Sequence, residues 1–249
     1  MPAYPVQALV LRKTKLGETD VIVTLLAADG SQIRAVAKGK RKPGSRFGGR
    51  LEPYVVADLL LHTGKSLDVI TEADTIDSHG ALREDYDRSM AAAVVADLLD
   101  KIAVEAQGEP RLFGLANATL SAMELCPPAT LPALVAAFLV KALAMHGYRP
   151  ELESCAACAC EATGGRLFSM GAGGVLCPQC GERDGSAIHF HEEGRALLVH
   201  FLGSTMADIA AAELPADTVA ECLTLMKSFV GFHIPARLKA LDMYAGPVA

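Results

Sequence analysis

Four cysteines, Cys155, Cys158, Cys177 and Cys180, form the pattern C-x2-C-x18-C-x2-C. Each C-x2-C pair fits a tight turn that points two sulfurs at one ion, and the spacing between the pairs lies within the zinc-ribbon range. Because four thiolates fill the tetrahedral shell of Zn²⁺, such a site leaves no position open for a catalytic water. The pattern therefore predicts one structural Zn²⁺ in a small knuckle.

A pair of disulfides or a redox C-x-x-C motif would use the same cysteines. Residues 1–26 lack the charged and apolar regions of a signal peptide, so we expect a reducing compartment, where structural disulfides are rare. Cys160 lies beside the site and could replace Cys158 as a ligand. The nearby His189 and His191 alternate with a phenylalanine, which is more typical of a short strand edge than of a ligand pair.

The composition favours a soluble protein with a helical core. Of the 249 residues, 51% are apolar and none is tryptophan, so Ala, Leu and Val must build the core. No apolar run reaches the roughly 18 residues that a membrane span needs, since Pro132 and Lys141 interrupt the stretch 131–145 and Asp97 interrupts 90–99. We therefore expect a cytoplasmic location and no membrane contact.

Charge is divided unevenly along the chain. Residues 1–50 hold ten Lys or Arg against three Asp or Glu, whereas residues 51–249 hold thirteen against twenty-six, which gives net charges of +7 and −13. The segment 30–51 contains no acid, and such a concentration of positive charge is typical of a polyanion site. Its seven cations are Arg34, Lys38, Lys40, Arg41, Lys42, Arg46 and Arg50.

The first 75 residues predict a small β-domain. β-Branched and aliphatic runs, separated by turn signals such as Asp29-Gly30, predict five strands. Five short strands with one long loop between the third and fourth favour a closed barrel of the OB type, which commonly binds nucleic acid, and an SH3-like barrel fits the count almost as well. The predicted strands are residues 6–11, 21–26, 33–37, 51–62 and 66–72.

From residue 76 the pattern becomes helical. Apolar residues recur at three- and four-residue spacing, and Gly- or Pro-containing breaks separate the segments. The predicted fold class is α+β, with an OB-type domain at 1–75 followed by a helical domain at 76–249 that carries the zinc knuckle at about 151–186. The predicted helices are residues 88–105, 112–125, 133–145, 192–202 and 216–232.

The basic loop at 38–50 suits nucleic acid. Lys and Arg neutralise phosphates, four glycines favour mobility, and Phe47 offers a face on which a base can stack. A merely solvated loop is the alternative, but seven like charges repel one another and a bound anion relieves that cost. No phosphate-loop, G-x-S-x-G or H-E-x-x-H motif is present, and no recognisable catalytic constellation predicts an enzyme.

Two independent groups of motifs resemble the RecO family of bacterial DNA repair proteins, in its zinc-bearing members. The first group is V-Q-A-L-V-L at 6–11, L-G-E-T-D at 16–20, A-K-G-K-R at 37–41 and R-F-G-G-R-L-E-P at 46–53. The second is G-Y-R-P-E-L at 147–152, F-S at 168–169, G-G at 173–174 and the two C-x2-C pairs. The resemblance runs over essentially the whole chain in order.

The resemblance implies a recombination mediator of the RecF pathway that catalyses no covalent reaction. Family members bind single- and double-stranded DNA, anneal complementary strands, join RecR and help to load RecA onto DNA coated by single-strand-binding protein. The implied location is the bacterial cytoplasm, at the nucleoid. Pro235 interrupts a C-terminal segment where a more basic helix is expected, so Arg237 and Lys239 receive no role. The basic loop falls on the family's basic segment, which assigns DNA contacts to Lys38, Lys40, Arg41, Lys42, Arg46 and Arg50.

Two other classes remain open from the residues alone. An OB barrel with a zinc ribbon also suits structured RNA, as in a translation-associated protein. A protein-only scaffold would instead use the acidic part for its main contacts and dock the basic loop on an acidic partner. The charge division itself predicts that DNA is held at the barrel while the acidic helical body contacts RecR or single-strand-binding protein.

Overall fold

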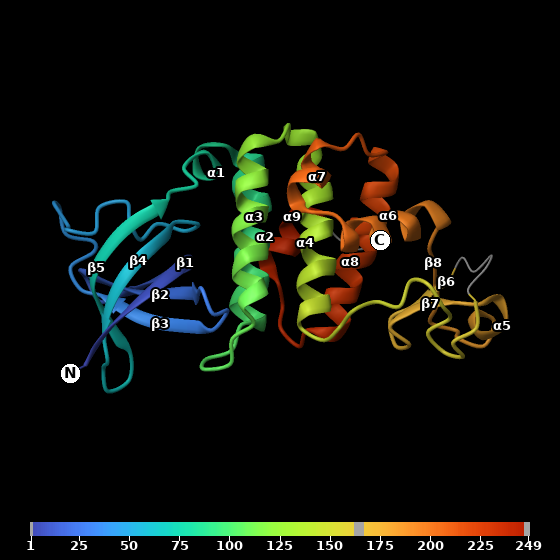
Figure 1. The fold of residues 1–249 in the computed structure, drawn as a ribbon, viewed down its shortest axis with the longest axis horizontal. Coiled ribbons are helices and arrows are strands. Elements are labelled where there is room, and N and C mark those ends of the chain that lie inside the picture. Colours follow the sequence, from blue (N-terminus) through green and yellow to red (C-terminus); the bar gives the residue numbers. More distant parts are fainter. Residues whose placement is uncertain (1, 162–166, 247–249) are drawn as a thin grey trace. The chain divides into compact units, whose positions relative to one another are not determined.

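The computed structural model describes residues 2–161 and 167–246, which form two compact units, Met1–Glu124 and Leu125–Ala249. The first unit holds a closed five-stranded barrel and the helices that follow it, and the second holds further helices and the four-cysteine knuckle (Figure 1). This arrangement confirms the predicted fold class. Helices α1 to α3 fall in the same compact unit as the barrel, and the domain boundary at residues 75 and 76 stays a prediction.

The barrel is closed in the order β1-β2-β3-β5-β4. Antiparallel pairs connect β1 to β2 and to β4, while β3 and β5 run parallel and pair Ala35 with Asp68 and Val36 with Val69. This parallel closure is that of the OB fold and decides against the SH3-like alternative. The strands are β1 (Ala3–Leu16), β2 (Asp20–Ala27), β3 (Gln32–Ala37), β4 (Val56–His62) and β5 (Asp68–Asp77).

Alternating aliphatic residues fill the barrel interior. Val21, Val23 and Leu25 of β2 are buried in its core cluster, as the period of two in a strand requires. The hairpin between β2 and β3 turns at Gly30, whose φ of +83° favours glycine. Strand β4 begins at Val56 rather than at the predicted residue 51, because residues 38–55 form a different structure.

The segment 38–55 is a coil of successive turns. Backbone hydrogen bonds from residue i+3 to residue i recur along it, from Lys42 N to Gly39 O (3.1 Å), Ser45 N to Lys42 O (3.1 Å) and Gly48 N to Ser45 O (3.0 Å). Phe47 and Leu51 are fully buried in the barrel core. The glycines predicted to make this loop mobile instead allow turns, since Gly39, Gly44 and Gly48 all have positive φ.

Three helices complete the first unit, α1 (Ala81–Glu84), α2 (Tyr86–Ile102) and α3 (Pro110–Leu125). The Asp85 side chain caps α2 by accepting the Arg88 N–H at 2.9 Å. Helix α2 contacts β1 and β2, and Asp100 pairs with Arg12 of β1 at 3.0 Å. Gly108 approaches the backbone of Asp29 so closely that a Cβ there would lie 2.1 Å from the Asp29 carbonyl oxygen.

Helix α4 is the central element of the second unit. It contacts α6, α7 and α8 and is buried on nearly every side, including Phe138 and Leu139. The window Pro128–Met145 is long and apolar enough to cross a membrane, contrary to the prediction from runs of residues, but 61% of it is buried inside the protein. The helices are α4 (Leu131–Met145), α6 (Glu192–Gly203), α7 (Met206–Ala211), α8 (Ala216–His233) and α9 (Lys239–Ala245), with a 3₁₀ turn at Pro128–Thr130.

The knuckle is a small module in the second unit. Strands β6 (Leu167–Ser169), β7 (Gly174–Leu176) and β8 (Ile188–His189) form a sheet in the order β7-β6-β8, and the short helix α5 (Pro178–Gly181) follows β7. Gly174 lies against the backbone of Glu151, where a Cβ would be 2.3 Å from the carbonyl oxygen. The buried cluster around the cysteines is small, so a metal has much to contribute to the stability of that part of the module.

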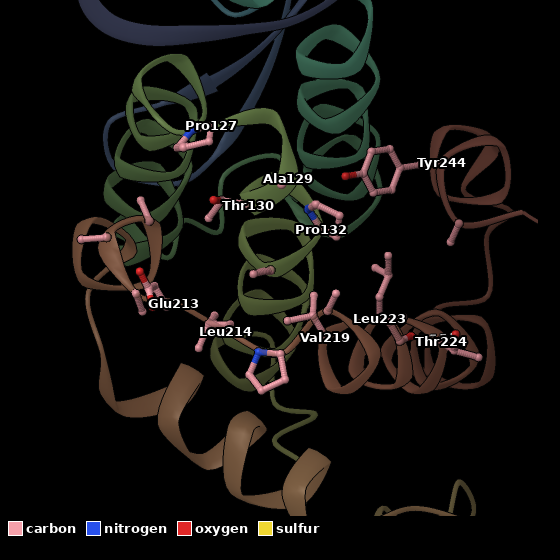
Figure 2. A pocket seen from close by; sticks show the side chains of 18 residues that line it. Pro127, Ala129, Thr130, Pro132, Glu213, Leu214, Val219, Leu223, Thr224 and Tyr244 are labelled. Atoms are coloured by element: carbon pink, nitrogen blue, oxygen red, sulfur yellow. Dashed lines mark hydrogen bonds between the residues drawn. The ribbon is translucent and has the colours of Figure 1, made fainter.

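A cavity of about 850 Å³ opens among α4, α7, α8 and α9 (Figure 2). Its lining is mostly alanine, proline and leucine, and Glu213 is the only charged side chain among the lining residues. The lining is therefore predominantly apolar.

Candidate nucleic-acid interface and metal centre

The basic part of the segment of turns, residues 38–50, is named the turn coil here. It exposes most of the predicted cations to solvent. Lys38, Arg41, Lys42, Arg46 and Arg50 are exposed, and none of them forms a salt bridge with any residue that the structure describes. Arg34 is also exposed, on β3 of the same barrel. Six of the seven predicted cations are thus available to an anion.

Lys40 is the exception. Its side chain is only 10% exposed, and its Nζ lies 2.6 Å from the Gly48 carbonyl oxygen and 3.1 Å from Glu52 Oε1. Glu52 also pairs with Lys13 of β1. Burial raises the pKa of Glu52, but the hydrogen bonds from Lys13 and Lys40 outweigh it and the net pKa is lowered. Lys40 therefore holds the coil in place, and the sequence signal for this role is Glu52, one residue beyond the acid-free segment.

Phe47 corrects the prediction of a stacking face. Its side chain is 1% exposed and belongs to the barrel core cluster, so the ring offers no face to a base in this position. The guanidinium of Arg46 lies 4.9 Å from the ring centroid, which keeps that cation at the surface above the core. Phe47 anchors the basic coil from within.

The coil is attached to the turn between β1 and β2. Arg41 N donates to the Thr19 carbonyl oxygen at 2.9 Å, and Gly39 N donates to Asp20 Oδ1 at 2.8 Å. This backbone hydrogen bond is the main reason that the pKa of Asp20 is lowered, so the anchor is a carboxylate. Lys15, exposed near the same turn, adds a cation that the acid-free stretch of sequence did not include.

The four predicted ligand cysteines meet in the knuckle. All four Sγ atoms lie within 4.8 Å of one another, and Cys158 Sγ is 3.8 Å from Cys177 Sγ. A tetrahedral zinc with Zn–S bonds of about 2.3 Å requires sulfur–sulfur edges of about 3.8 Å. All seven cysteines are free thiols, so the disulfide alternative does not fit.

The charge state of the cluster also suits a cation. Burial raises the pKa of Cys155, but hydrogen bonds from the backbone N–H groups of Cys177, Ala157 and Cys158 lower it by more. The net pKa is about 6. Hydrogen bonding to Cys158 and Cys177 raises the pKa of Cys180 to about 12. Thiolates this close repel one another, and a divalent cation removes that repulsion. The donor set therefore fits a metal site.

The other predicted ligand candidates lie outside this group of four. Cys160 Sγ is 3.3 Å from Cys158 Sγ but does not join the mutually close set. His189 lies on the edge strand β8, as its sequence pattern suggests. His191 is 2.7 Å from Glu221 Oε1 and is used in that pair.

A second cluster of possible metal ligands lies in the first unit. His79 is fully buried, with Nδ1 2.9 Å from Glu124 Oε2 and Nε2 3.2 Å from Asn117 Oδ1. Asp77 Oδ1 lies 3.6 Å from the same Nδ1. Because both ring nitrogens already have hydrogen-bond partners, this histidine fastens the end of β5 to α3 without a metal.

Comparisons with known proteins point to one family. Family models described as Recombination protein O, N terminal and C terminal, match residues 1–79 and 83–242. The DNA repair protein RecO of Thermobifida fusca is 36% identical over 246 residues, which cover 98% of each chain. The RecO of a Nocardioides species is 38% identical and covers 96% of this chain and 97% of its own.

The chain belongs to the RecO family. These proteins are mediators of recombination rather than enzymes. The RecO of Desulfitobacterium hafniense is 42% identical over 181 residues, which span 72% of this chain and 65% of that protein. The barrel and the four-cysteine cluster are thus features of a RecO protein.

Proposed function

We propose that this RecO protein holds DNA by its phosphates at the turn coil of residues 38–50 and acts as a mediator of recombination. The observation that supports this most directly is the set of exposed cations on the coil, none in a salt bridge with a described residue. A barrel of the OB type commonly binds oligonucleotides, and the coil lies beside its first hairpin turn. The proposed phosphate contacts are Arg34, Lys38, Arg41, Lys42, Arg46 and Arg50, with Lys15.

The mediator role follows from these contacts. Side chains that bind phosphate and read no base grip single- and double-stranded DNA alike, which suits annealing of complementary strands. In this role the protein works in the bacterial cytoplasm at the nucleoid, with RecR and single-strand-binding protein as partners, and assists RecA indirectly. The knuckle holds one structural Zn²⁺ through Cys155, Cys158, Cys177 and Cys180.

Salt dependence of DNA binding tests the proposed interface. We compare the full chain with the triple variant Lys38→Ala/Lys42→Ala/Arg46→Ala by fluorescence anisotropy over a range of salt concentrations. Loss of three phosphate contacts should flatten the salt slope by roughly 2 to 3, at about 0.7 to 0.9 per contact, and weaken binding similarly for all sequences. Stability should change little, because exposed loop charges support little packing.

Two controls make the test specific. The triple variant Arg149→Ala/Arg183→Ala/Lys239→Ala removes the same charge from exposed positions of the second unit and should leave the slope unchanged. Lys40→Ala should instead destabilise the fold more than it weakens DNA binding, because Lys40 pairs with Glu52. An unchanged slope in the first variant would place the DNA elsewhere, and tighter binding of a matched RNA oligomer would favour the RNA alternative.

A further inference from the structure

A fifth thiol stands beside the metal cluster and has no role in it. Cys160 Sγ lies 3.3 Å from Cys158 Sγ, and both side chains are exposed. In contrast, Cys155 and Cys177 are only 1% and 6% exposed. Cys158 is therefore the cluster thiolate most open to a small oxidant, and its nearest additional thiol is Cys160.

The backbone holds these two thiols together. Ala159, between them, has φ of +58°, a left-handed conformation that is unusual for alanine. Its N–H donates to the Cys155 carbonyl oxygen at 2.8 Å, and Cys155 N donates to the Cys160 carbonyl oxygen at 2.8 Å. Two hydrogen bonds thus close a tight turn around the two thiols, whose sulfurs are 3.3 Å apart.

We propose that Cys158 and Cys160 are a peroxide-sensitive pair, and that their oxidation to a disulfide expels the metal from the knuckle. The proposal rests on the proposed zinc site, because Cys158 serves both as a ligand and as the attacked sulfur. It assigns to Cys160 the role of a resolving thiol. Exposed thiolates poised next to a second cysteine are the usual targets of reversible oxidation.

The chemistry balances with hydrogen peroxide as the two-electron oxidant. The Cys158 thiolate attacks one peroxide oxygen, the O–O bond breaks, and the departing hydroxide takes a proton and leaves as water. The sulfenic acid on Cys158 is then attacked by the Cys160 sulfur, so that an S–S bond forms and the S–O bond breaks. The Cys160 proton leaves with that oxygen as a second water, and the two sulfurs together lose two electrons.

Loss of one ligand should loosen the knuckle alone. The core cluster around the ligands is small, with Cys155, Leu176 and Cys177 buried among a few partly buried neighbours, so the packing next to the ligands depends on the metal. The barrel has its own separate core, which includes Phe47 and Leu51. Oxidation should therefore change the knuckle surface and leave phosphate binding at the turn coil intact.

The test begins with metal analysis of the purified full chain, which separates failure of the zinc site from failure of the thiol pair. The zinc-loaded chain is treated with hydrogen peroxide while a chromophoric chelator reports zinc release and peptide mapping reports the disulfide. We expect release of the zinc together with a Cys158–Cys160 disulfide, reversed by a thiol reductant and added zinc. DNA anisotropy should stay unchanged throughout.

Matched variants decide the role of Cys160. Cys160→Ser should bind zinc and keep the wild-type melting temperature, yet form no disulfide and release zinc several-fold more slowly. Cys222→Ala removes a fully buried thiol of α8 and should release zinc and form the disulfide at the wild-type rate. Zinc release from Cys160→Ser at the wild-type rate, or a wild-type disulfide between Cys158 and Cys177, would overturn the proposal. A native chain without zinc would overturn the metal site beneath it.

Discussion

At the scale of single residues, Glu52 is the carboxylate that pairs with Lys40, the largely buried lysine of the turn coil. It accepts hydrogen bonds from Lys13 and Lys40, which connects β1 to the coil through one carboxylate. Its folded pKa is lowered, so the stabilisation is present above the unfolded pKa of about 4.3 and is lost as the pH falls through the folded value. Because the side chain is 33% exposed, solvent screening limits the contribution to about 1 kcal/mol or less.

We predict that Glu52→Gln lowers the free energy of unfolding at pH 7 and has a smaller effect at pH 3, because the stabilisation declines as the pH falls below the unfolded pKa of the carboxyl. Urea denaturation at both pH values measures the difference. Glu18→Gln is the control, since Glu18 is exposed and forms no salt bridge with a described residue. An equal loss of stability at the two pH values would show that Glu52 acts through packing rather than charge.

Single-residue roles within the basic segment were the hardest feature to predict from sequence. The acid-free run correctly indicated where the positive surface lies, but Lys40 and Phe47 face inward, toward Glu52 and the barrel core. A residue in a turn coil has no fixed period, so the side that it faces cannot be inferred from spacing, unlike a residue in a strand. Replacing Phe47 by alanine would cost about 3–5 kcal/mol as a core truncation.

At the scale of elements, regular periodicity predicted most of the structure. The long helices begin and end within a few residues of their predicted bounds, as for residues 216–232 and the observed Ala216–His233. Short elements such as α7 (Met206–Ala211) were missed because six residues carry too little periodic signal. The sequence predicted that all four cysteines meet, because each C-x2-C pair lies on a local turn whose spacing can be read from the sequence.

The stability of the whole knuckle should depend on its metal. We predict about one Zn²⁺ per chain and a clear fall in melting temperature for Cys177→Ser, because metal binding is coupled to folding of the module. Chelation of the wild type should lower the melting temperature by a similar amount, and chelation should add little to the variant. Calorimetry and metal analysis test this, with Cys160→Ser as the variant that keeps zinc. Full zinc occupancy in Cys177→Ser would contradict the ligand assignment.

At the scale of the whole molecule, the division of charge lies mainly within the first unit. Residues 51–124 hold five Lys or Arg against fourteen Asp or Glu, whereas residues 125–249 hold eight against twelve. The acidic excess is therefore greater in the part that shares a unit with the turn coil than in the second unit. On the outside of the barrel, exposed Asp58 of β4 pairs directly with exposed Asp74 of β5, and exposed Glu72 lies on the same strand as Asp74. DNA should follow the side of β3 and the coil and avoid this acidic face.

We predict that Asp58→Asn/Asp74→Asn, which removes two charges from the acidic face, raises DNA affinity only at low salt. At about 0.15 M salt the Debye length is about 8 Å, so charges farther than this from the bound DNA should not affect its affinity, whereas at about 0.01 M it is about 30 Å and affinity should rise. The melting temperature should also increase slightly, because like charges directly opposite in a sheet are destabilising. Asp58→Glu/Asp74→Glu keeps the charge and should bind as wild type at both salt concentrations. If neutralising the pair instead weakened DNA binding, the acidic strands would belong to the interface, and the coil of residues 38–50 would be only one part of it.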